Sequence, residues 1–454
     1  MMNRRSFLKG VAASAPLFLA PRVLGMDGPG PNDTINIGLI GLGGRCREMA
    51  ATTLGIPGAR IAAVCDCFQP RIDASLAALE SEGVTATGYV DFREMIEKEN
   101  LDGVMVITTT HAGAWVSCLA MAMGMDVYIE KPMSLTIAEG RDMVDVARKY
   151  DRVTQIGTQQ RSIPLNNWAS DLVKNGALGK VTQVLAPDFM GPYHWPGKEA
   201  EDMPAGGDDG WWDVWTNQAE FRPYHPELHR GWSRWWAYDG GGLSFGVTGW
   251  GTHSYDQIQR ALGTDETGPV EVLLEERVDE RRVGAFEERE ISEDETGAPY
   301  YNMVRNAVGP RAKTRMKFSN GTELLLHLDA DRSPGLGAIF VGENGRIEIN
   351  RDRISANPRE LIESDDRPAP LSVPETQPHV EDWLECIKTR ETCTADVEYG
   401  QRSTTLCYLV NIARDVGRIG EPLHWDPKAE KFTNCDEGNA MLSRPRRAGY
   451  ELSV

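Results

Sequence analysis

A glycine-rich turn, Gly41-x-Gly43-x-x-Cys46, is the first segment of the chain whose residue types suit ligand binding. It lies between an apolar run that starts at Thr34 and a helical pattern over 45–54. Glycines allow a positive φ and a close approach to a pyrophosphate, which then contacts the N–H groups at the helix start. Cys46 stands where the usual G-x-G-x-x-G pattern has its third glycine, so the turn alone is a weak signal of dinucleotide binding.

An acid follows the turn at the spacing expected of a ribose ligand. A second apolar run over 61–65 ends in Asp66, and an acid about 20 residues beyond the glycines reads the ribose 2′-hydroxyl. This spacing favours NAD as the cofactor. NADP is not excluded, because Arg45, Arg47 or Arg71 could bind a 2′-phosphate.

Lys131 and His253 are the candidates for acid–base chemistry. Lys131 precedes a proline at the end of an expected strand, the edge at which doubly wound sheets bind ligands. His253 belongs to a helical pattern in which Asp256 lies on the same face and could orient the imidazole. Histidine titrates near neutral pH, so it suits removal of the hydroxyl proton when a nicotinamide oxidises a secondary alcohol.

Strand and helix patterns alternate around these residues as far as residue 157. Strand patterns cover 103–108, 126–130 and 153–157, helical patterns cover 91–99 and 112–124, and a further helix begins at the capping box Thr136-x-x-Glu139. This alternation predicts an α/β fold with a doubly wound parallel sheet, in a first domain over 33–157.

The alternation stops after residue 157. Longer, half-buried strand patterns over 314–328 and 338–349 contain turn signals at 319–321 and 343–345. They predict a second α/β domain over 158–440, built on a large, mostly antiparallel open sheet and followed by a C-terminal tail over 441–454.

A tryptophan-rich insertion near 190–240 belongs to this second part. Eight of the 12 tryptophans lie between 195 and 250, among glycine, proline and aspartate. Aromatic faces beside polar groups suit a sugar, and Trp235 and Trp236 are the expected contacts. The alternatives are a loop anchored by its aromatic rings and a subunit interface.

The glycine turn, Glu130-Lys131-Pro132 and His253-x-x-Asp256 together resemble the glucose-fructose and inositol dehydrogenase-like (Gfo/Idh/MocA) oxidoreductases, as do 155–161 and 442–445. The resemblance implies a dinucleotide-binding Rossmann domain followed by an α/β domain with a largely antiparallel sheet. It also implies that Lys131 binds and polarises the reacting hydroxyl and that His253 moves its proton.

The resemblance and the spacing together give the expected site. The catalytic residues are Lys131, His253 and Asp256. The cofactor contacts are Gly41, Gly43, Gly44, Arg45, Asp66, Thr108, His111, Glu130 and Lys131. The substrate contacts are Lys131, Arg161, Trp235, Trp236 and His253.

One residue of the family pattern is missing. The family commonly has an acid four residues before the histidine, where this chain has Gly249. Without it the imidazole lacks a partner that would fix its tautomer and raise its basicity. Asp256, Asp239 and Asp213 are the candidates to replace it.

Charge and hydropathy limit the partners of the protein. Against 67 Asp and Glu there are 48 Lys and Arg, and the net charge of −19 disfavours nucleic acid and anionic lipid. A run of about 18 apolar residues does not occur, so no membrane span is expected.

Cysteine and histidine patterns give no sign of a disulfide scaffold or a metal site. The eight cysteines are few for this length and are expected to be buried thiols. Pro223 and Pro226 oppose a helix that would pair His225 with His229, so no metal ligand set is expected.

Residues 1–26 resemble an export signal. Arg4-Arg5 precede a mildly apolar stretch over 11–24, a twin-arginine pattern that implies export of the folded protein to the periplasm or the extracellular space. The cleavage position is left open.

These observations predict an NAD(P)-dependent oxidoreductase that acts on a secondary hydroxyl of a sugar, glycoside or polyol, with a tightly bound and recycled cofactor. The family resemblance implies a homo-oligomer, either a dimer or a tetramer. Two alternatives stay open: an NAD-dependent glycosidase-type cycle of oxidation, elimination and reduction, and a non-catalytic sugar-binding protein that retains the fold.

Overall fold

The structure is a computed structural model that describes residues 34–242, 245–282, 292–293, 299–300, 308–329 and 334–452. The predicted export signal, residues 1–26, lies outside the described residues. The first part of the chain forms a six-stranded parallel sheet with the strand order β3-β2-β1-β4-β5-β6. Its strands are β1 (Ile35–Ile40), β2 (Ala59–Cys65), β3 (Thr87–Tyr89), β4 (Gly103–Val106), β5 (Asp126–Ile129) and β6 (Thr154–Ile156).

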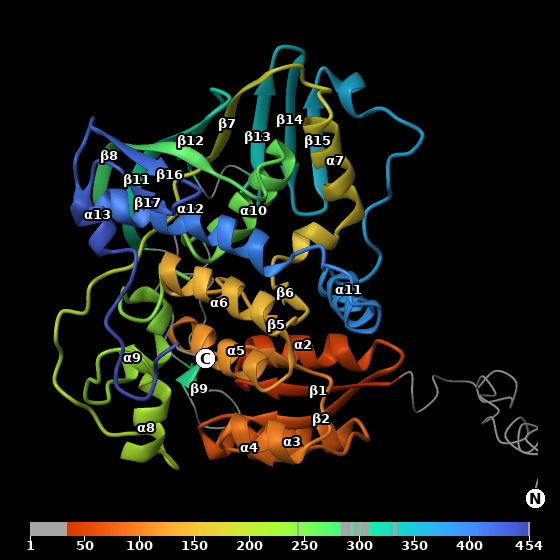
Figure 1. Ribbon diagram of the computed structural model, residues 1–454, viewed down its shortest axis with the longest axis vertical. Coiled ribbons are helices and arrows are strands. Elements are labelled where there is room, and N and C mark those ends of the chain that lie inside the picture. Colours follow the sequence, from red (N-terminus) through yellow and green to blue (C-terminus); the bar gives the residue numbers. More distant parts are fainter. Residues whose placement is uncertain are drawn as a thin grey trace, which may run out of the picture.

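Helices cover both faces of this sheet (Figure 1). One face packs against α2 (Gly44–Leu54), α3 (Gln69–Ser81) and α11 (Thr376–Thr389), the last of which returns from the C-terminal half. The other face packs against α4 (Phe92–Lys98), α5 (Thr110–Ala122) and α6 (Ile137–Lys149). The doubly wound parallel sheet predicted from the sequence is therefore confirmed, and its strand order is that of dinucleotide-binding folds.

The start of α6 follows the prediction from the capping box. Thr136 Oγ1 accepts a hydrogen bond of 3.2 Å from the N–H of Glu139. Glu139 Oε2 accepts one of 3.0 Å from the N–H of Leu135, one residue before the cap. Two of the N–H groups at this helix start are thereby satisfied by side chains.

The second part of the chain forms a nine-stranded sheet with the order β15-β14-β13-β7-β12-β11-β8-β16-β17. Its strands are β7 (Val181–Pro187), β8 (Pro269–Arg282), β11 (Val308–Phe318), β12 (Glu323–Leu328), β13 (Ala338–Gly342), β14 (Gly345–Asn350), β15 (Arg353–Asn357), β16 (Pro422–Asp426) and β17 (Lys431–Phe432). β7 and β12 pair in parallel, whereas the other described neighbours pair antiparallel. The expected mostly antiparallel sheet is confirmed.

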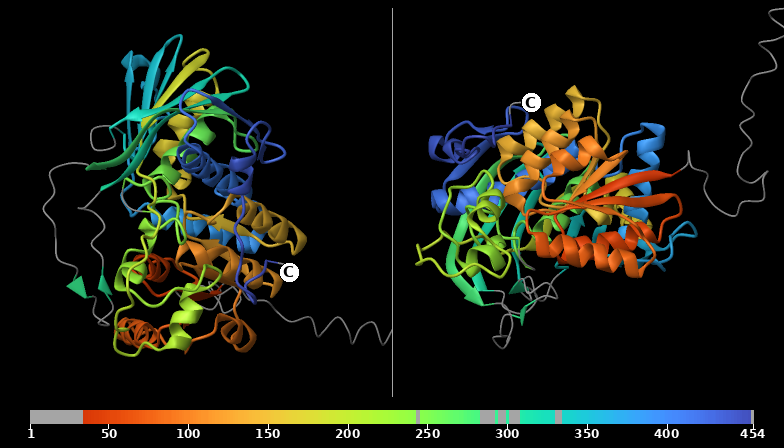
Figure 2. Two further views of the ribbon diagram at one scale, coloured as in Figure 1. Left: turned by 90° about the vertical axis from the view of Figure 1, so that its left-hand side faces the viewer. Right: turned by 90° about the horizontal axis from the view of Figure 1, so that it is seen from below.

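Three helices pack on one face of this sheet: α7 (Pro164–Lys174), α10 (Trp250–Leu262) and α12 (Val397–Val416). Figure 2 shows them between the large sheet and the parallel sheet. Because α10 and α12 lie between the two sheets, residues at the start of α10 come close to the strand ends of the first sheet. The remaining short elements are β9 (Ser292–Glu293), β10 (Pro299–Tyr300), α13 (Asp436–Ala440) and the 3-10 turns η3 (Gln159–Ser162), η4 (Trp232–Arg234) and η5 (Arg359–Ile362).

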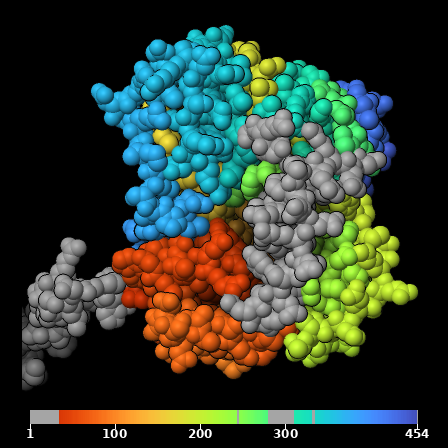
Figure 3. Space-filling model, turned by 180° about the vertical axis from the view of Figure 1, so that it is seen from behind, coloured from red at the N-terminus to blue at the C-terminus, as the bar shows by residue number. Residues whose placement is uncertain are grey.

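The tryptophan-rich segment lies beside the first part of the chain (Figure 3), and its aromatic residues form a separate small core with Phe68 of that part. It contains α8 (Asp209–Thr216) and α9 (Pro226–Arg230), and Trp211 packs against Phe68 of the first part with ring centroids 4.8 Å apart. The expectation that prolines prevent a helix near 226 is wrong. Pro226 occupies the first helical position, where a missing N–H costs nothing.

None of the helices in the described part of the chain is both long and apolar enough to cross a membrane.

Candidate functional site

The glycine turn after β1 leaves the start of α2 open to a ligand. Gly41 has a φ of +89°, and a Cβ atom there would lie 2.7 Å from the carbonyl oxygen of Ile107, so only glycine fits. Gly43, the residue before α2, provides no side-chain cap, and the first turn of α2 contains no acidic residue. The N–H groups of this helix start therefore suit an anion such as a pyrophosphate.

Asp66 lies directly after β2 and contacts the glycine turn. Its Oδ2 accepts a hydrogen bond of 2.8 Å from the N–H of Leu42, and its Oδ1 accepts one of 2.9 Å from the N–H of Phe68. Each carboxylate oxygen can accept a second hydrogen bond, so Asp66 is still able to bind ribose hydroxyls. The turn and Asp66 together fit an NAD-type dinucleotide.

Arg45 and Glu130 join the start of α2 to the end of β5. Arg45 Nε donates a hydrogen bond of 2.9 Å to Glu130 Oε1, to which Gln159 Nε2 also donates, at 3.1 Å. Burial disfavours both charges, but the attraction between them prevails: the pKa of Arg45 is raised and that of Glu130 is lowered. The pair fixes the strand end that carries Lys131.

Lys131 follows this pair and has a cis peptide bond to Pro132. Its Nζ forms no hydrogen bond or ion pair with another described residue. Burial lowers the pKa of Lys131 below its ordinary value, although Glu130 and Asp239 act to raise it. A lysine with a lowered pKa and free donors suits both the binding of a hydroxyl and the uptake of its proton.

His253 lies in the first turn of α10 and is 5% exposed. Its Nδ1 is buried and has no hydrogen-bond partner among the described residues. Burial, together with the positive charges of Arg351 and Lys131, lowers the pKa of His253 well below its ordinary value. The ring is therefore neutral near pH 7. It is ready to form a hydrogen bond with a ligand but poorly suited to hold an added proton.

Asp256 does not orient His253 as expected. Its Oδ2 accepts a hydrogen bond of 2.7 Å from Arg161 Nε, and its Oδ1 accepts one of 2.7 Å from Ser403 Oγ. Arg161 Nη2 also donates to Asp265, at 2.6 Å. Because a fully buried guanidinium needs carboxylate partners, Arg161 draws Asp256 to itself. The structure thus places Arg161 and Asp256 in a buried ion pair with each other.

Asp239 is the candidate acid whose charge acts on Lys131. It is fully buried, and its carboxylate accepts hydrogen bonds from Thr110 Oγ1, at 2.7 Å, and from Thr248 Oγ1. Burial raises the pKa of Asp239 to about 6, while these two hydrogen bonds and the charge of Lys131 act to lower it. Of the three acids considered as replacements for the one absent at Gly249, Asp239 therefore has the most suitable surroundings, and its charge acts on Lys131.

Asp213, the third candidate, lies elsewhere. Its side chain is 48% exposed and forms an ion pair with Arg447 of the C-terminal tail. It contributes to the attachment of the tail and has no described contact with Lys131 or His253.

Arg351 was not anticipated from the sequence. It lies in the turn between β14 and β15, and its Nη1 forms an ion pair of 2.9 Å with Glu375. Its charge acts on His253. The pattern of the β14–β15 hairpin predicts a turn but gives no sign that the turn reaches the end of the other sheet.

Thr108 and His111 follow β4 but lie in different surroundings. Thr108 is next to the glycine turn, its Cα 2.9 Å from where a Cβ of Gly41 would be. His111 is fully buried, and its Nε2 forms a hydrogen bond of 2.8 Å with the carbonyl oxygen of Trp215. Burial lowers the pKa of His111 to about 4. The structure thus uses its imidazole to attach the tryptophan-rich segment to α5.

Trp235 and Trp236 pack mainly against other protein groups. Trp235 Nε1 donates a hydrogen bond of 2.9 Å to the carbonyl oxygen of Glu227, and the ring meets that of Trp195 edge to face. The guanidinium carbon of Arg444 lies 4.2 Å from the centroid of the Trp236 ring. These contacts agree with the alternative of a segment anchored by its aromatic rings.

The fold and the open helix start are those of a dinucleotide-binding protein of two α/β parts, and comparison with known proteins supplies the family. Residues 35–158 match the model "Oxidoreductase family, NAD-binding Rossmann fold". Residues 166–298 and 295–452 match the model "Oxidoreductase family, C-terminal alpha/beta domain". The chain belongs to the Gfo/Idh/MocA oxidoreductase family.

Individual relatives are more distant. Inositol 2-dehydrogenase of Salmonella typhimurium is 26% identical over 156 residues, which are 33% of this chain and 45% of the relative. Glycosyl hydrolase family 109 protein 1 of Bacteroides thetaiotaomicron is 26% identical over 182 residues, 36% of this chain and 37% of the relative. The matches thus span less than half the length of these relatives.

A solved structure shares the fold over a longer range. The aldose-aldose oxidoreductase from Caulobacter crescentus, crystallised with glycerol, aligns with a TM-score of 0.57 at 19% identity. The alignment covers 86% of this chain and 99% of that chain.

Proposed function

We propose that this protein is an exported, NAD-dependent oxidoreductase that acts on a secondary hydroxyl of a sugar, glycoside or polyol and keeps its cofactor bound between turnovers. The observation that supports this most is that the charge of Lys131, which follows β5 of the sheet with the glycine turn, acts on both His253 and Asp239. Export rests on the twin-arginine pattern of residues 1–26. Tight binding follows from export, because free NAD is scarce outside the cytoplasm.

The glycine turn and Asp66 would hold NAD, which when bound accepts a hydride from the carbon that bears the hydroxyl. His253, as a neutral imidazole with a free ring nitrogen, positions that hydroxyl by a hydrogen bond. Lys131 has the lowered pKa of a group that can take up the proton. The ammonium so formed is stabilised by Asp239 and Glu130, whereas a protonated His253 would face cations. The surroundings thus favour Lys131 as the base and His253 as the positioning residue, the reverse of the roles implied by the family resemblance.

The net reaction has two candidates that share this first step. In one, the hydride from one sugar reduces another, so the cofactor is restored without leaving the protein. In the other, transient oxidation acidifies the neighbouring C–H bond, the leaving group of a glycoside is eliminated, water adds to the double bond so formed, and the hydride returns. The similarity to the family 109 glycosyl hydrolase is the reason to test the second reaction, glycoside cleavage.

The first experiment is to denature the protein, purified without added nucleotide, and identify what is released by mass and absorbance. We expect about one NAD(H) per chain. A protein that releases none and binds neither NAD nor NADP in titration would contradict the proposal and favour a sugar-binding protein without chemistry.

The second experiment uses a panel of sugars, polyols and aryl glycosides and follows the absorbance of the bound reduced nicotinamide. Oxidised sugar with transfer of a deuterium label to a second sugar indicates exchange, and release of the aryl group indicates glycoside cleavage. Failure of the whole panel to reduce the bound cofactor would contradict action on carbohydrates.

A further inference from the structure

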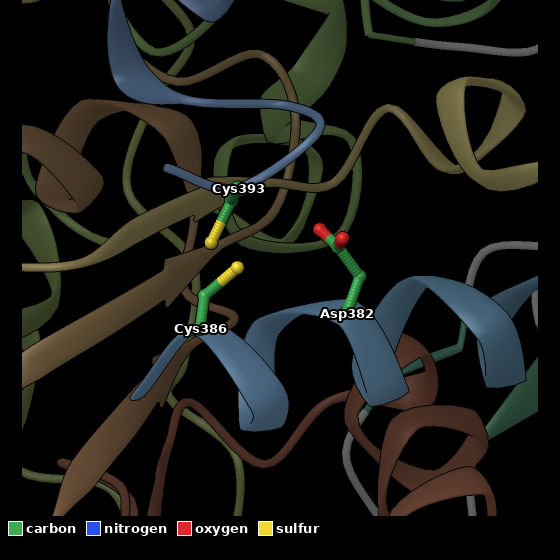
Figure 4. Close-up of side chains that lie close together, drawn as sticks. All are labelled: Asp382, Cys386 and Cys393. Carbon is green, nitrogen blue, oxygen red and sulfur yellow. The ribbon is translucent and has the colours of Figure 1, made fainter. Parts of the chain in front are cut away.

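Cys386 and Cys393 form a pair of thiols at the end of α11 (Figure 4). Their sulfur atoms and a carboxylate oxygen of Asp382 all lie within 4.8 Å of one another. Cys386 lies in the last turn of α11, and Cys393 lies on the segment that follows the helix. Figure 4 shows the two sulfur atoms directed toward each other.

The backbone on both sides of the pair is held in place. After α11, Arg390 adopts a φ of +62°, which turns the chain back toward the helix, and its side chain forms an ion pair with Asp126. The N–H of Thr394 donates a hydrogen bond of 2.9 Å to Asp382 Oδ2. The N–H of Ala395 donates one of 3.0 Å to Gln155 Oε1. Cys393 is therefore fixed opposite Cys386 by the fold itself.

The two thiols differ in acidity. A hydrogen bond donated by the S–H of Cys393 lowers the pKa of Cys386, and the same bond, with burial, raises the pKa of Cys393. In contrast, burial raises the pKa of Cys46, Cys118 and Cys407. Cys386 is thus the more nucleophilic of the pair, because the thiolate is the reactive form.

We propose that Cys386 and Cys393 form a disulfide when the protein meets an oxidising compartment, and that this bond fastens the end of α11 to the segment after it, in which the Ala395 carbonyl accepts a hydrogen bond from the N–H of Ile156 in β6. The proposal goes beyond the oxidoreductase activity and does not depend on it.

A small disulfide such as oxidised glutathione is the oxidant. The Cys386 thiolate attacks one of its sulfur atoms and expels one thiolate, which leaves a mixed disulfide. Cys393, on losing its proton, attacks Cys386 Sγ and expels the second thiolate. The two protein thiols lose two electrons and two protons in all, and the oxidant leaves as two thiols.

The cross-link would stabilise the packing of α11 against the parallel sheet. Earlier on α11, His379 Nε2 forms a hydrogen bond of 2.8 Å with the carbonyl oxygen of Ile156, the last residue of β6. Trp383, also on α11, is fully buried against the parallel sheet. Closing the loop between residues 386 and 393 restricts the unfolded chain and opposes separation of α11 from the sheet.

A metal ion is the competing occupant of this cluster, but the donor set fits it less well. Only three potential ligand groups converge among the described residues, whereas a structural zinc site has four. Asp382 Oδ2 already accepts hydrogen bonds from Gln155 Nε2 and Thr394 N–H.

The test uses the full chain after exposure to oxidised glutathione or to dithiothreitol. Each sample is denatured, alkylated and digested with trypsin, which cuts after Lys388 and Arg390 and so separates Cys386 from Cys393. We expect two of the eight cysteines to escape alkylation after oxidation, and two tryptic peptides to stay joined with a mass two hydrogens below their sum. The oxidised protein should melt a few degrees above the reduced one.

Cys386→Ser and Cys393→Ser should each abolish the joined peptides, whereas Cys407→Ser, a buried cysteine elsewhere, should leave them intact. Full alkylation of both cysteines after oxidation would overturn the proposal, as would a bond from Cys386 to another cysteine. One zinc per chain that is lost in Cys386→Ser and blocks oxidation would overturn it in favour of a metal site. Equal melting temperatures of the oxidised and reduced protein would overturn the fastening role.

Discussion

Lys131 and Asp239 are far apart in the sequence, yet their charges act on each other. Against the larger effect of burial, the charge of Asp239 contributes to raising the pKa of Lys131, and the charge of Lys131 contributes to lowering the pKa of Asp239. Lys131 follows the fifth strand of the parallel sheet, and Asp239 ends the tryptophan-rich segment. The carboxylate is held by Thr110, at the start of α5, and by Thr248, just before α10. Asp239 thus connects the two halves of the molecule at the point where we place the chemistry.

Asp239→Asn should shift the pH dependence of oxidation toward acid. Removing the negative charge takes away a contribution that raises the pKa of Lys131, so the rise of kcat/KM with pH should occur about 1 pH unit lower. The ammonium form loses a partner, so kcat should fall roughly 10-fold. The measurement is a pH profile with the best substrate of the panel. Asp213→Asn, at a half-exposed acid paired with Arg447, is the control and should leave the profile unchanged; a midpoint that moves to higher pH would contradict the role of Asp239.

Substitution of Lys131 and His253 should separate the base from the positioning residue. Lys131→Met should lower kcat about 10²- to 10⁴-fold, the usual contribution of a general base, and should abolish the acid limb of the pH profile. His253→Asn can still form a hydrogen bond and should mainly raise KM, with a loss in kcat of roughly 10-fold. Loss of the acid limb in His253→Asn, with its retention in Lys131→Met, would restore His253 as the base.

The first half of the fold is predictable because its signals are local. Apolar runs of strand length alternate with helical patterns, and Thr136 with Glu139 marks a helix start by contacts within four residues. The helix at Pro226 shows the limit of such rules, since the same proline that breaks a helix in its interior is tolerated at its first position.

The site was only partly predictable, because its charges meet through tertiary packing. The spacing of His253 and Asp256 predicts a shared helix face, but it gives no sign of Arg161, which takes the carboxylate of Asp256. The charge of Arg351, in a hairpin of the other sheet, acts on His253. The sequence supplies residue types and local spacing. Pairs of residues that are distant in the sequence depend on how the two halves of the chain pack together.

Gly41→Ala should impair NAD binding more than it impairs folding elsewhere. The added Cβ would meet the Ile107 carbonyl at 2.7 Å in a backbone conformation with φ +89°, so the turn must move away from the pyrophosphate position. We expect the Kd for NAD to rise roughly 10-fold or more, with a loss of about 1–3 kcal/mol in the free energy of unfolding. Gly83→Ala is the matched control, because Gly83 has φ +76° but open space around its Cα. Equal loss of NAD affinity in both variants would contradict the assignment of the turn.

Asp66→Ala should change cofactor preference. The substitution removes the acceptor for ribose hydroxyls and the hydrogen bond to the Leu42 N–H, so NAD should bind roughly 10-fold more weakly. NADP should lose less or gain, because the carboxylate no longer repels a 2′-phosphate. Titration of nucleotide-free protein with NAD and NADP measures the ratio of the two Kd values. Unchanged NAD affinity in Asp66→Ala would rule out Asp66 as the ribose ligand.

Asp256→Asn should affect stability first and activity only as a consequence. It leaves the fully buried Arg161 with Asp265 as its remaining carboxylate partner, and the loss of one partner in a buried ion pair typically costs about 3 kcal/mol or more. Asp265 is 18% exposed, so Asp265→Asn should cost less, and the free energies of unfolding of the two variants in urea test this order. Because Asp256 makes no described contact with His253, the pH profile of folded Asp256→Asn should match that of the unmodified protein. A displaced profile at unchanged stability would show that Asp256 acts on His253 after all.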